Sequence, residues 1–290
     1  PVELAREVVS ASTTLETGEL HFKADYLNPG KDTSFRIYYN GVDSDYLTNQ
    51  TYGAENVWSN NYIAVYHMDD DPDNGVNFLL DSTANGYNGT ASGTMSSADI
   101  VSGQIGSALD FDGVDDRINT GANYTLTDGS ISVWASLSDA QSEVATLWGK
   151  DENGVFNGDM VAGAGANTSN RFWYSYQSGA NVVSTTDLAT STMYHQVFSW
   201  GSAGKDLYIN GVETATSSQT DGLTNSSEDF IIGGIRDVVP ETWYGLIDEF
   251  KVSSVNRTAG WIKTEYYNQA TTTLFYRLDS GTGSTTLANS

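Results

Sequence analysis

The sequence predicts an all-β fold, because both its composition and its patterning are typical of short strands joined by tight turns. Glycine supplies 29 of the 290 residues and proline only 4, and serine, threonine and asparagine are abundant. These polar residues and glycine favour turns. Apolar and polar residues alternate in many short segments, which is the pattern of strands half buried in a sheet. Since 39% of the residues are hydrophobic, the chain is able to bury a large β-sandwich and a smaller unit.

The first part of the chain predicts a small β unit. Alternation in residues 18–24 and again in residues 34–40 predicts two half-buried strands. Residues 56–68 contain a nearly continuous apolar run, which predicts a central strand covered on both faces. We therefore expect three parts, namely a partial small β unit over residues 1–55, a sandwich over residues 56–279 and a flexible tail of low complexity over residues 280–290.

The middle of the chain predicts one strand after another. Residues 130–137 and 171–176 alternate as sheet strands with one wetter face. Residues 207–216 predict a β-hairpin that turns at Asn210 and Gly211. Asn-Gly accepts the positive φ angles that a type I′ turn requires, so this hairpin is the most sharply defined local prediction.

Two late strands are predicted over residues 230–232 and 244–252. In the second, Ile247 and Phe250 cannot lie on one face of the sheet under strict alternation. We therefore expect a bulge near residues 248–249.

A short helix is predicted near the C-terminal end, over residues 258–268, because its large side chains recur at helical spacing. Residues 273–278 predict one further strand after it.

The charge of the chain is strongly negative, with 13 Lys and Arg against 37 Asp and Glu and a formal net charge of −24. Phosphate backbones and anionic membranes would be repelled, so we expect no nucleic-acid partner. The longest apolar runs, such as residues 62–68, are far too short to span a bilayer, so we expect no membrane insertion. Cation binding and simple solubility both fit the acidic surface. Cysteine is absent, which excludes disulfides, thiolate zinc sites and a cysteine nucleophile.

Six segments together resemble the concanavalin A-like, laminin-G-type jelly-roll family of bacterial surface and carbohydrate-active proteins. They occur in the order of that family and are 81–90 (DSTANGYNGT), 106–116 (GSALDFDGVDD), 130–137 (SISVWASL), 194–200 (YHQVFSW), 207–212 (LYINGV) and 244–252 (YGLIDEFKV). The resemblance implies an antiparallel jelly-roll β-sandwich in a bacterial protein that is secreted or displayed on the cell surface.

Both flanks also resemble segments that accompany such jelly rolls. Residues 35–41 (FRIYYNG) resemble the end of a small β domain of uncharacterised function that often precedes them in exported bacterial proteins. Residues 261–269 (WIKTEYYNQ) resemble the segment that commonly follows. The N-terminal unit is shorter than that small domain, so we expect the chain to be part of a longer protein.

The same resemblance implies a structural calcium ion held between an early loop and a late strand. Calcium takes hard oxygen ligands, which are abundant in the predicted loops. The implied ligands are Asp81, Asn85 and Asn88 from the loop, Asp248 or Glu249 from the strand, and Asp112 nearby.

Several of these residues also have an ordinary structural interpretation. Asp81 is suited to begin an Asx turn. Asp112, which precedes a glycine, is suited to a type I′ turn. Asp248 is suited to pair with Arg117 or with Lys251.

Aromatic side chains are the expected contacts for a glycan, because flat rings stack on the apolar faces of sugars. Most tryptophans in a sandwich belong to its core. We favour Trp173, which shares a strand face with Arg171, and Trp243, which lies in the loop-like segment PETWYG. The other available tryptophans are Trp134, Trp148 and Trp200.

No recognisable catalytic motif is present, so we expect the protein not to be an enzyme. A glycosidase needs two carboxylates roughly 5–9.5 Å apart, often on one strand, and the chain has no Glu-x-Asp-x-x-Glu run. His21, His67 and His195 are far apart in sequence and lack metalloprotease spacing, so we expect an ordinary structural role for each. A nucleophile elbow and a phosphate-binding loop are also lacking in the sequence.

These observations favour a non-catalytic carbohydrate-binding or adhesive module whose partner is a glycan or polysaccharide. One alternative is a structural or self-assembling surface subunit whose edge strands pair with neighbouring domains or subunits. A third interpretation is a polysaccharide hydrolase or lyase with an unrecognised carboxylate pair.

Overall fold

The computed structural model describes residues 2–12, 14, 17–28, 31–37, 44–139, 144–152, 155–165, 171–176, 182–224, 227–235 and 241–270. The side chains of residues 152, 155–159 and 173–176 lie outside this description. So do the strand predicted over residues 273–278 and the tail predicted over residues 280–290.

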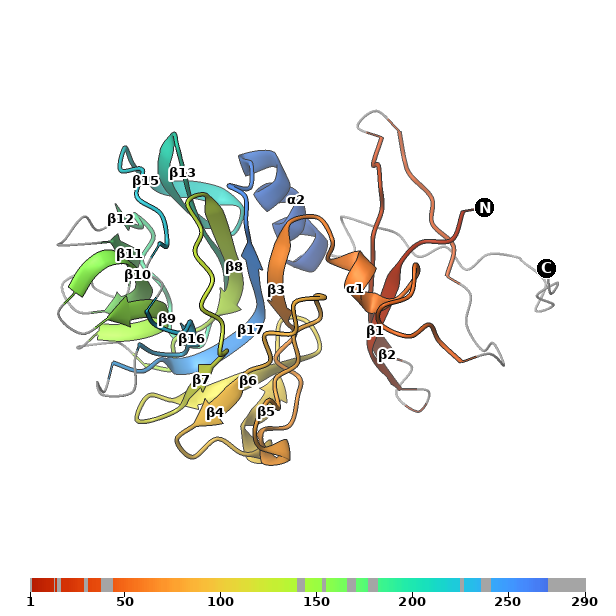
Figure 1. Ribbon diagram of the computed structural model, residues 1–290, viewed down its shortest axis with the longest axis horizontal. Coiled ribbons are helices and arrows are strands. Elements are labelled where there is room, and N and C mark those ends of the chain that lie inside the picture. The colour runs from red at the N-terminus through yellow and green to blue at the C-terminus, as the bar shows by residue number, and fades with distance from the viewer. Residues whose placement is uncertain are drawn as a thin grey trace.

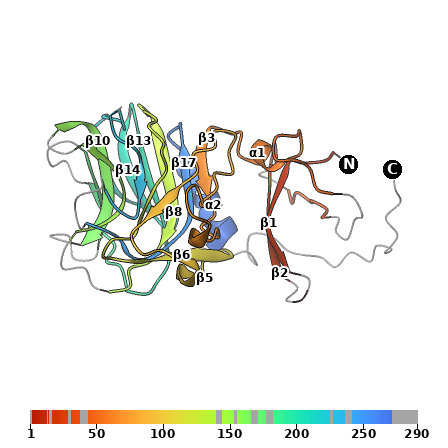
Figure 2. The ribbon, with the colours of Figure 1, turned by 60° about the horizontal axis from the view of Figure 1, so that its bottom comes forward.

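The described part of the chain folds into two large antiparallel sheets packed face to face, with a small two-stranded sheet beside them (Figure 1). The predicted all-β fold, the small N-terminal unit and the C-terminal helix are thereby confirmed. The boundary that we expect before residue 56 stays a prediction. Figures 1 and 2 show the small sheet standing to one side of the sandwich.

Within the described residues, one large sheet has seven strands in the order β12-β11-β10-β9-β16-β7-β4. Every neighbouring pair in it is antiparallel. We call it the seven-stranded sheet, and its strands are β4 (Thr90–Ser92), β7 (Arg117–Asn119), β9 (Val144–Glu152), β10 (Val155–Gly165), β11 (Phe172–Tyr176), β12 (Val182–Val183) and β16 (Ile231–Ile232).

The other large sheet has eight strands among the described residues, in the order β15-β14-β13-β8-β17-β6-β5 with β3 paired to β17. We call it the eight-stranded sheet, and its strands are β3 (Tyr62–Tyr66), β5 (Ile100–Ser102), β6 (Ser107–Asp112), β8 (Gly129–Ala135), β13 (Tyr194–Gly201), β14 (Gly204–Ile209), β15 (Val212–Ser217) and β17 (Tyr244–Ser253).

The N-terminal hairpin pairs β1 (Arg6–Ser12) with β2 (Thr17–Phe22), and the short helix α1 (Ala54–Val57) follows it in the chain. The prediction of a strand over residues 34–40 is wrong where the structure describes it, because residues 34–37 have no regular structure. Their side chains are exposed, so the alternating pattern has no sheet to pack on. The apolar run at 56–68 gives α1 and then β3, a shorter strand than predicted.

Helix α2 (Ala259–Ala270) confirms the predicted C-terminal helix and covers the outer face of the eight-stranded sheet (Figures 1 and 2). Ile262 of α2 packs on Val197 and Tyr208. The predicted wetter face of residues 130–137 is therefore polar but buried, since β8 is buried along its whole length. No helix in the described ranges has the length and apolar character needed to cross a membrane.

The core lies between the two large sheets and is rich in aromatic rings. The Trp148 ring stacks on Phe230 at 5.6 Å and meets Phe198 edge-on at 5.4 Å. Phe230 also contacts Phe250, and all four side chains are fully buried. Burying one large apolar side chain contributes roughly 1.5–3 kcal/mol, so contacts of this kind supply the main stabilisation of the sandwich.

Strand β17 carries the predicted bulge. Its pairing with β8 shifts register between Asp248 and Lys251, and Glu249 has a positive φ of 50°. Because of the extra residue, Ile247 and Phe250 both reach the core. The bulge also divides the opposite edge of β17, which pairs with β6 up to Ile247 and with β3 from Phe250 onward.

The predicted hairpin is also confirmed. β14 and β15 are joined at Asn210 and Gly211, whose φ angles are 52° and 74°. Both angles are positive, as a type I′ turn requires.

His195 provides a pH test of this packing. The imidazole is fully buried against Trp134 and within 3.1 Å of the Ser132 hydroxyl, and burial lowers its pKa to about 4. The unfolded chain takes up this proton near pH 6.5, so the stability contributed by neutral His195 is lost as pH falls from about 6.5 to about 4, by roughly 3 kcal/mol. Urea unfolding between pH 4 and pH 7 should show a smaller loss for His195→Gln. If the parent protein and His195→Gln lose the same free energy of unfolding between pH 7 and pH 4, the buried neutral imidazole does not cause the loss.

Candidate functional site

A polar pocket of about 320 Å³ lies on the outer face of the seven-stranded sheet, where β4 and β7 form its edge. Ala91 of β4 and Ile118 of β7 pack into the core. Because side chains alternate across a strand, their neighbours Thr90 and Asn119 point away from the core and into the pocket. The lining side chains and backbone belong to Asn77, Asn88, Thr90, Ser92, Asn119, Gly121 and Asp229.

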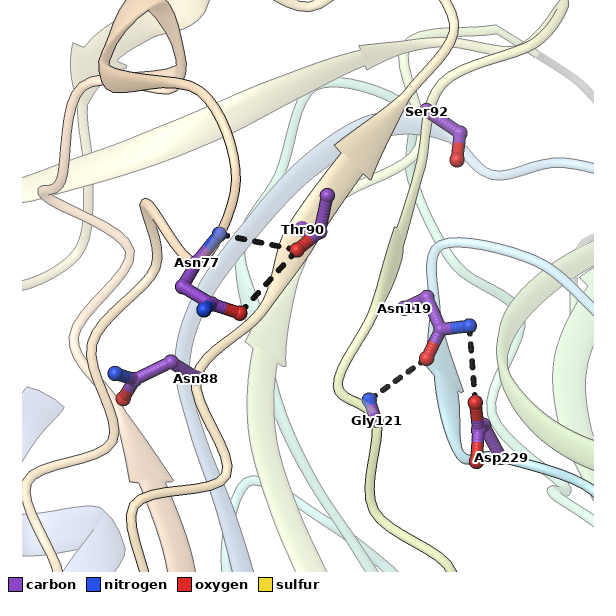
Figure 3. Close-up of a pocket in the computed structure, with 7 residues that line it drawn as sticks. All are labelled: Asn77, Asn88, Thr90, Ser92, Asn119, Gly121 and Asp229. Carbon is purple, nitrogen blue, oxygen red and sulfur yellow. Dashed lines mark hydrogen bonds between the residues drawn. The ribbon is translucent and has the colours of Figure 1, made fainter.

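Internal hydrogen bonds hold these groups in place (Figure 3). On one side, the Asn119 amide donates to Asp229 at 3.2 Å and accepts from the Gly121 N–H at 2.7 Å. On the other side, the Asn77 N–H donates to the Thr90 hydroxyl at 3.0 Å. The pocket therefore presents amide, hydroxyl and carboxylate groups that are already oriented, which suits a ligand with many hydroxyl groups.

The tryptophans predicted as sugar platforms do not form this site. Trp243 is fully buried, stacks on Phe172 with ring centroids 6.1 Å apart and donates to the Leu246 carbonyl, so the proposal of a ligand contact at Trp243 is wrong. The segment PETWYG resembles an exposed loop in the sequence, but the Trp243 ring lies in the core between the two large sheets. Three further tryptophans are also at most 2% exposed, and they are Trp134, Trp148 and Trp200.

The other two predicted ligand contacts lie on β11 or next to it. The side chain of Trp173 lies outside the described residues, so its role stays a prediction. Arg171 precedes β11, and its Nε donates to the Asp187 carboxylate at 2.6 Å in an exposed ion pair. Among the described side chains, Arg171 does not belong to the pocket lining.

Three of the predicted calcium ligands do lie together, in the loop that follows β3. Asp81 Oδ1 accepts from the N–H groups of Val65 and Thr83, and Oδ2 accepts from the Thr83 hydroxyl and the Tyr87 N–H. The bond to Thr83 is the predicted Asx turn. Asn88 accepts from the Asp81 N–H at 2.9 Å.

This loop takes the place of a neighbouring strand for β3. Besides the Asp81 bond to Val65, the Asn85 amide donates to the Ile63 carbonyl at 2.8 Å and the Ser82 N–H donates to the Val65 carbonyl at 3.0 Å. Unpaired strand edges are costly and prone to unwanted pairing. Asp81 and Asn85 are thus engaged in closing a sheet edge, which accounts for their spacing without a metal.

The predicted strand ligands are separated from that loop and from each other. Asp248 Oδ2 accepts from the N–H groups of Gln104 and Ile105 at 2.8 and 3.0 Å. Burial, together with the neighbouring Glu249 charge, raises the pKa of Asp248 to about 8. Lys251 pairs with Glu249 at 2.6 Å and not with Asp248. The structure therefore does not assemble the six predicted ligands into one calcium site.

Asp112 lies in a different acidic cluster, which could hold a metal ion. One carboxylate oxygen from each of Asp112, Asp115 and Asp116 lies within 4.8 Å of the others. Asp112 Oδ1 accepts from the N–H groups of residues 114, 115 and 116, and Asp116 accepts from the N–H of Thr94. Burial and nearby carboxylates raise the pKa of Asp116 to about 6.

The turn that carries this cluster differs from the predicted type I′ turn. Gly113 has a positive φ of 73°, whereas Asp112 is the last residue of β6. Asp116 immediately precedes β7, which carries Asn119, so the acidic cluster lies at the start of a strand that lines the pocket.

The sequence did not single out Asn77, Asn119 or Asp229, because each is an ordinary polar residue with no motif around it. Alternation around the apolar Ile118 was the available signal for Asn119. The structure also stacks His21 on His67, with ring centroids 4.7 Å apart, although the two lie far apart in the sequence and we expected an ordinary structural role for each. Contacts between residues so far apart in the sequence depend on the order of strands in the sheets.

The role of Asp81 can be tested by Asp81→Ala. The change removes four hydrogen bonds to one carboxylate and leaves buried donors without partners, so we expect unfolding free energy to fall by about 2–4 kcal/mol. The loss should be the same in chelator-treated protein with and without added calcium. The exposed Asp32→Ala is the matched control and should unfold like the parent protein. A loss seen only with calcium would assign Asp81 to an ion instead.

Comparisons with known proteins agree with this architecture. Residues 112–263, more than half of the chain, match the family model of the concanavalin A-like lectin/glucanases superfamily. Domain 4 of AbnA, a GH43 extracellular arabinanase from Geobacillus stearothermophilus solved with arabinotriose, is 22% identical with a TM-score of 0.54. The match covers 70% of this chain and 96% of that domain. No curated protein sequence matches the chain.

Two further structures share the fold. The binding domain of Paraclostridial Mosquitocidal Protein 1 is 13% identical with a TM-score of 0.53, and the match covers 72% of this chain and 52% of that one. A Trypanosoma rangeli sialidase in complex with 2,3-difluorosialic acid is 15% identical with a TM-score of 0.53, over 73% of this chain. The match spans 33% of the sialidase. The sheet order and the family match together show that the chain belongs to the concanavalin A-like lectin/glucanase superfamily, as the six sequence segments predicted.

Proposed function

We propose that this chain is a carbohydrate-binding module without catalytic activity of its own, in a bacterial protein that is secreted or displayed on the cell surface. The observation that carries the proposal is the pocket of amide, hydroxyl and carboxylate groups between Asn77 and Asp229. The fold shared with an arabinanase domain that was solved with arabinotriose supports a glycan as the ligand.

The chemistry of the pocket matches a sugar better than it matches an ion or an apolar molecule. Its lining offers both donors and acceptors, as the Asn119 amide illustrates by doing both within the site. Sugar hydroxyls also donate and accept, so they can pair with every group in such a lining. A volume of about 320 Å³ lies near the lower limit of ligand pockets, so a longer glycan would extend beyond it.

The same lining argues against hydrolysis at this site. Among the described residues that line the pocket, Asp229 supplies the carboxylate, and it is held by Asn119. Glycoside hydrolysis needs a second carboxylate about 5–9.5 Å away. Binding is therefore the activity that these residues support.

The acidic cluster of Asp112, Asp115 and Asp116 is proposed as a calcium site that stiffens the start of β7. Three carboxylates at short range repel one another, and a hard divalent cation relieves that repulsion. An ordered β7 keeps Asn119 in register with Thr90, its partner on β4.

Asp229→Ala tests the pocket. Removing the carboxylate takes away one charged hydrogen bond worth about 1.5–3 kcal/mol, so we expect the affinity for a bound oligosaccharide to fall roughly 10- to 100-fold. Isothermal titration calorimetry measures this affinity, with arabino-oligosaccharides and with any glycan that binds on a glycan array. Asp206→Ala is the matched control, since Asp206 is a half-exposed carboxylate on the eight-stranded sheet. If no glycan binds and light scattering shows oligomers that grow with concentration, a self-assembling subunit is favoured instead.

Calcium added alone to chelator-treated protein should raise the melting temperature by roughly 3–10 °C at concentrations well above its Kd. Asp115→Asn should abolish the rise, because Asp115 belongs to the cluster while the bonds of the turn are accepted by Asp112 and Asp116. Asp32→Asn is the control. Identical melting with and without calcium would refute the site.

A further inference from the structure

A second set of metal-ligating side chains lies where the N-terminal hairpin meets the sandwich, away from the pocket. We propose that Glu19, His21, His67 and Glu249 bind a single zinc ion that fastens the hairpin to the eight-stranded sheet. This site is distinct from the acidic cluster proposed for calcium, and it does not depend on glycan binding.

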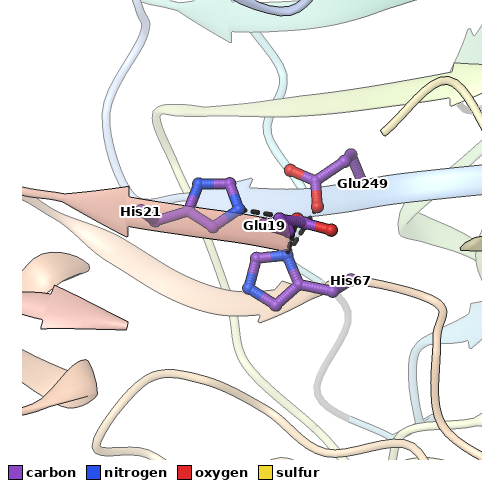
Figure 4. A group of neighbouring side chains, drawn as sticks. All are labelled: Glu19, His21, His67 and Glu249. Atoms are coloured by element: carbon purple, nitrogen blue, oxygen red, sulfur yellow. Dashed lines mark hydrogen bonds and ion pairs between the residues drawn. The ribbon is translucent and has the colours of Figure 1, made fainter. Parts of the chain in front are cut away.

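The four donors converge on one point, with one ligand atom from each residue and all four within 4.8 Å of one another (Figure 4). The His67 Nδ1 atom lies 2.5 Å from Glu249 Oε1 and 3.6 Å from Glu19 Oε1, and His21 Nε2 lies 2.7 Å from Glu19 Oε1. Tetrahedral zinc with bonds of about 2.0–2.1 Å holds neighbouring ligand atoms roughly 3.3 Å apart. The separations in the structure, from 2.5 Å up to at most 4.8 Å, lie on both sides of this value.

Three separate elements bring the donors together. Glu19 and His21 occupy alternate positions of β2, so their side chains share one face. His67 directly follows β3, and Glu249 is the positive-φ residue of the bulge in β17. The bulge is what turns the Glu249 side chain toward the hairpin side, while Asp248 binds the backbone of residues 104 and 105.

Neighbouring groups already orient the ligands. The His67 Nε2 atom faces Glu7 Oε2 at 3.3 Å, which is the carboxylate–histidine arrangement that leaves Nδ1 available for a metal. Glu7 is itself fixed by the Trp58 indole N–H. Glu249 uses Oε2 for Lys251 at 2.6 Å, so its Oε1 is the oxygen directed at His67.

The electrostatic balance of the junction also favours a cation. The carboxylates of Glu7, Glu19 and Glu249 are 12%, 7% and 0% exposed, and Lys251 pairs with the last of them. Burying carboxylates together without enough positive charge is costly. A divalent ion bound by all four residues supplies that charge.

The donor types select the ion and its role. Two imidazole nitrogens disfavour calcium and magnesium, which prefer oxygen, and suit zinc and similar metals. Four protein ligands complete a tetrahedral shell, which is the form of a structural and not a catalytic zinc site.

The experiment uses the full chain, stripped with a chelator and titrated with zinc in a calorimeter. We expect one zinc per chain, a rise in melting temperature and no displacement by excess calcium. Cobalt in place of zinc should give the visible absorption of a tetrahedral site. Zinc binding should be lost in His21→Gln, whose half-buried ring makes the change mild, and in His67→Gln. His195→Gln, which alters a buried histidine outside the cluster, should bind like the parent protein.

Either of two results would overturn the proposal. One is the absence of zinc binding by folded parent protein at micromolar concentrations. The other is equal zinc binding by the parent protein and by both histidine variants. Titrating the same chelator-treated protein with oligosaccharide measures glycan binding independently, so a failure of zinc binding is distinguished from a failure of glycan binding.

Discussion

The hydrogen-bond ladders of β17 determine how the rest of the molecule is assembled. On one edge this strand pairs with β8, and on the other it pairs first with β6 and then with β3. The change of partner occurs at the bulge around Glu249, whose positive φ of 50° costs backbone energy. The bulge persists because it lets Ile247 and Phe250 both enter the core, and burial of two large apolar side chains exceeds that cost.

The outer faces of the two large sheets differ in what covers them. The outer face of the eight-stranded sheet carries Ser132, Trp134 and His195, and α2 covers them, as in the bond from the Trp134 indole to Gln269. Glu7 and Glu19 of the N-terminal hairpin contact His67, which directly follows β3 of the same sheet. The outer face of the seven-stranded sheet has the polar pocket at its β4–β7 edge, where Thr90 and Asn119 point away from the core.

Polar side chains form many of the hydrogen bonds to backbone groups that a neighbouring strand would otherwise form. Asp81 and Asn85 complete the edge of β3, Asp112 and Asp116 hold the turn between β6 and β7, and Asp248 holds the backbone at residues 104 and 105. The strongly acidic composition therefore serves several local structures and is not a measure of metal binding by itself. Clusters become candidate metal sites only where several ligand atoms converge, as they do around Asp115 and around His67.

The sequence by itself determined the local features of this protein. Alternation predicted the sheets, Asn210 and Gly211 predicted the hairpin turn, and the mismatch of Ile247 with Phe250 predicted the bulge, because each depends on residues only a few positions apart. Only the tertiary structure decided that Trp243 is buried, that Asn119 meets Asp229, and that His21 meets His67. Those contacts depend on which strands are neighbours and which face is covered, and that is set by packing of the whole chain.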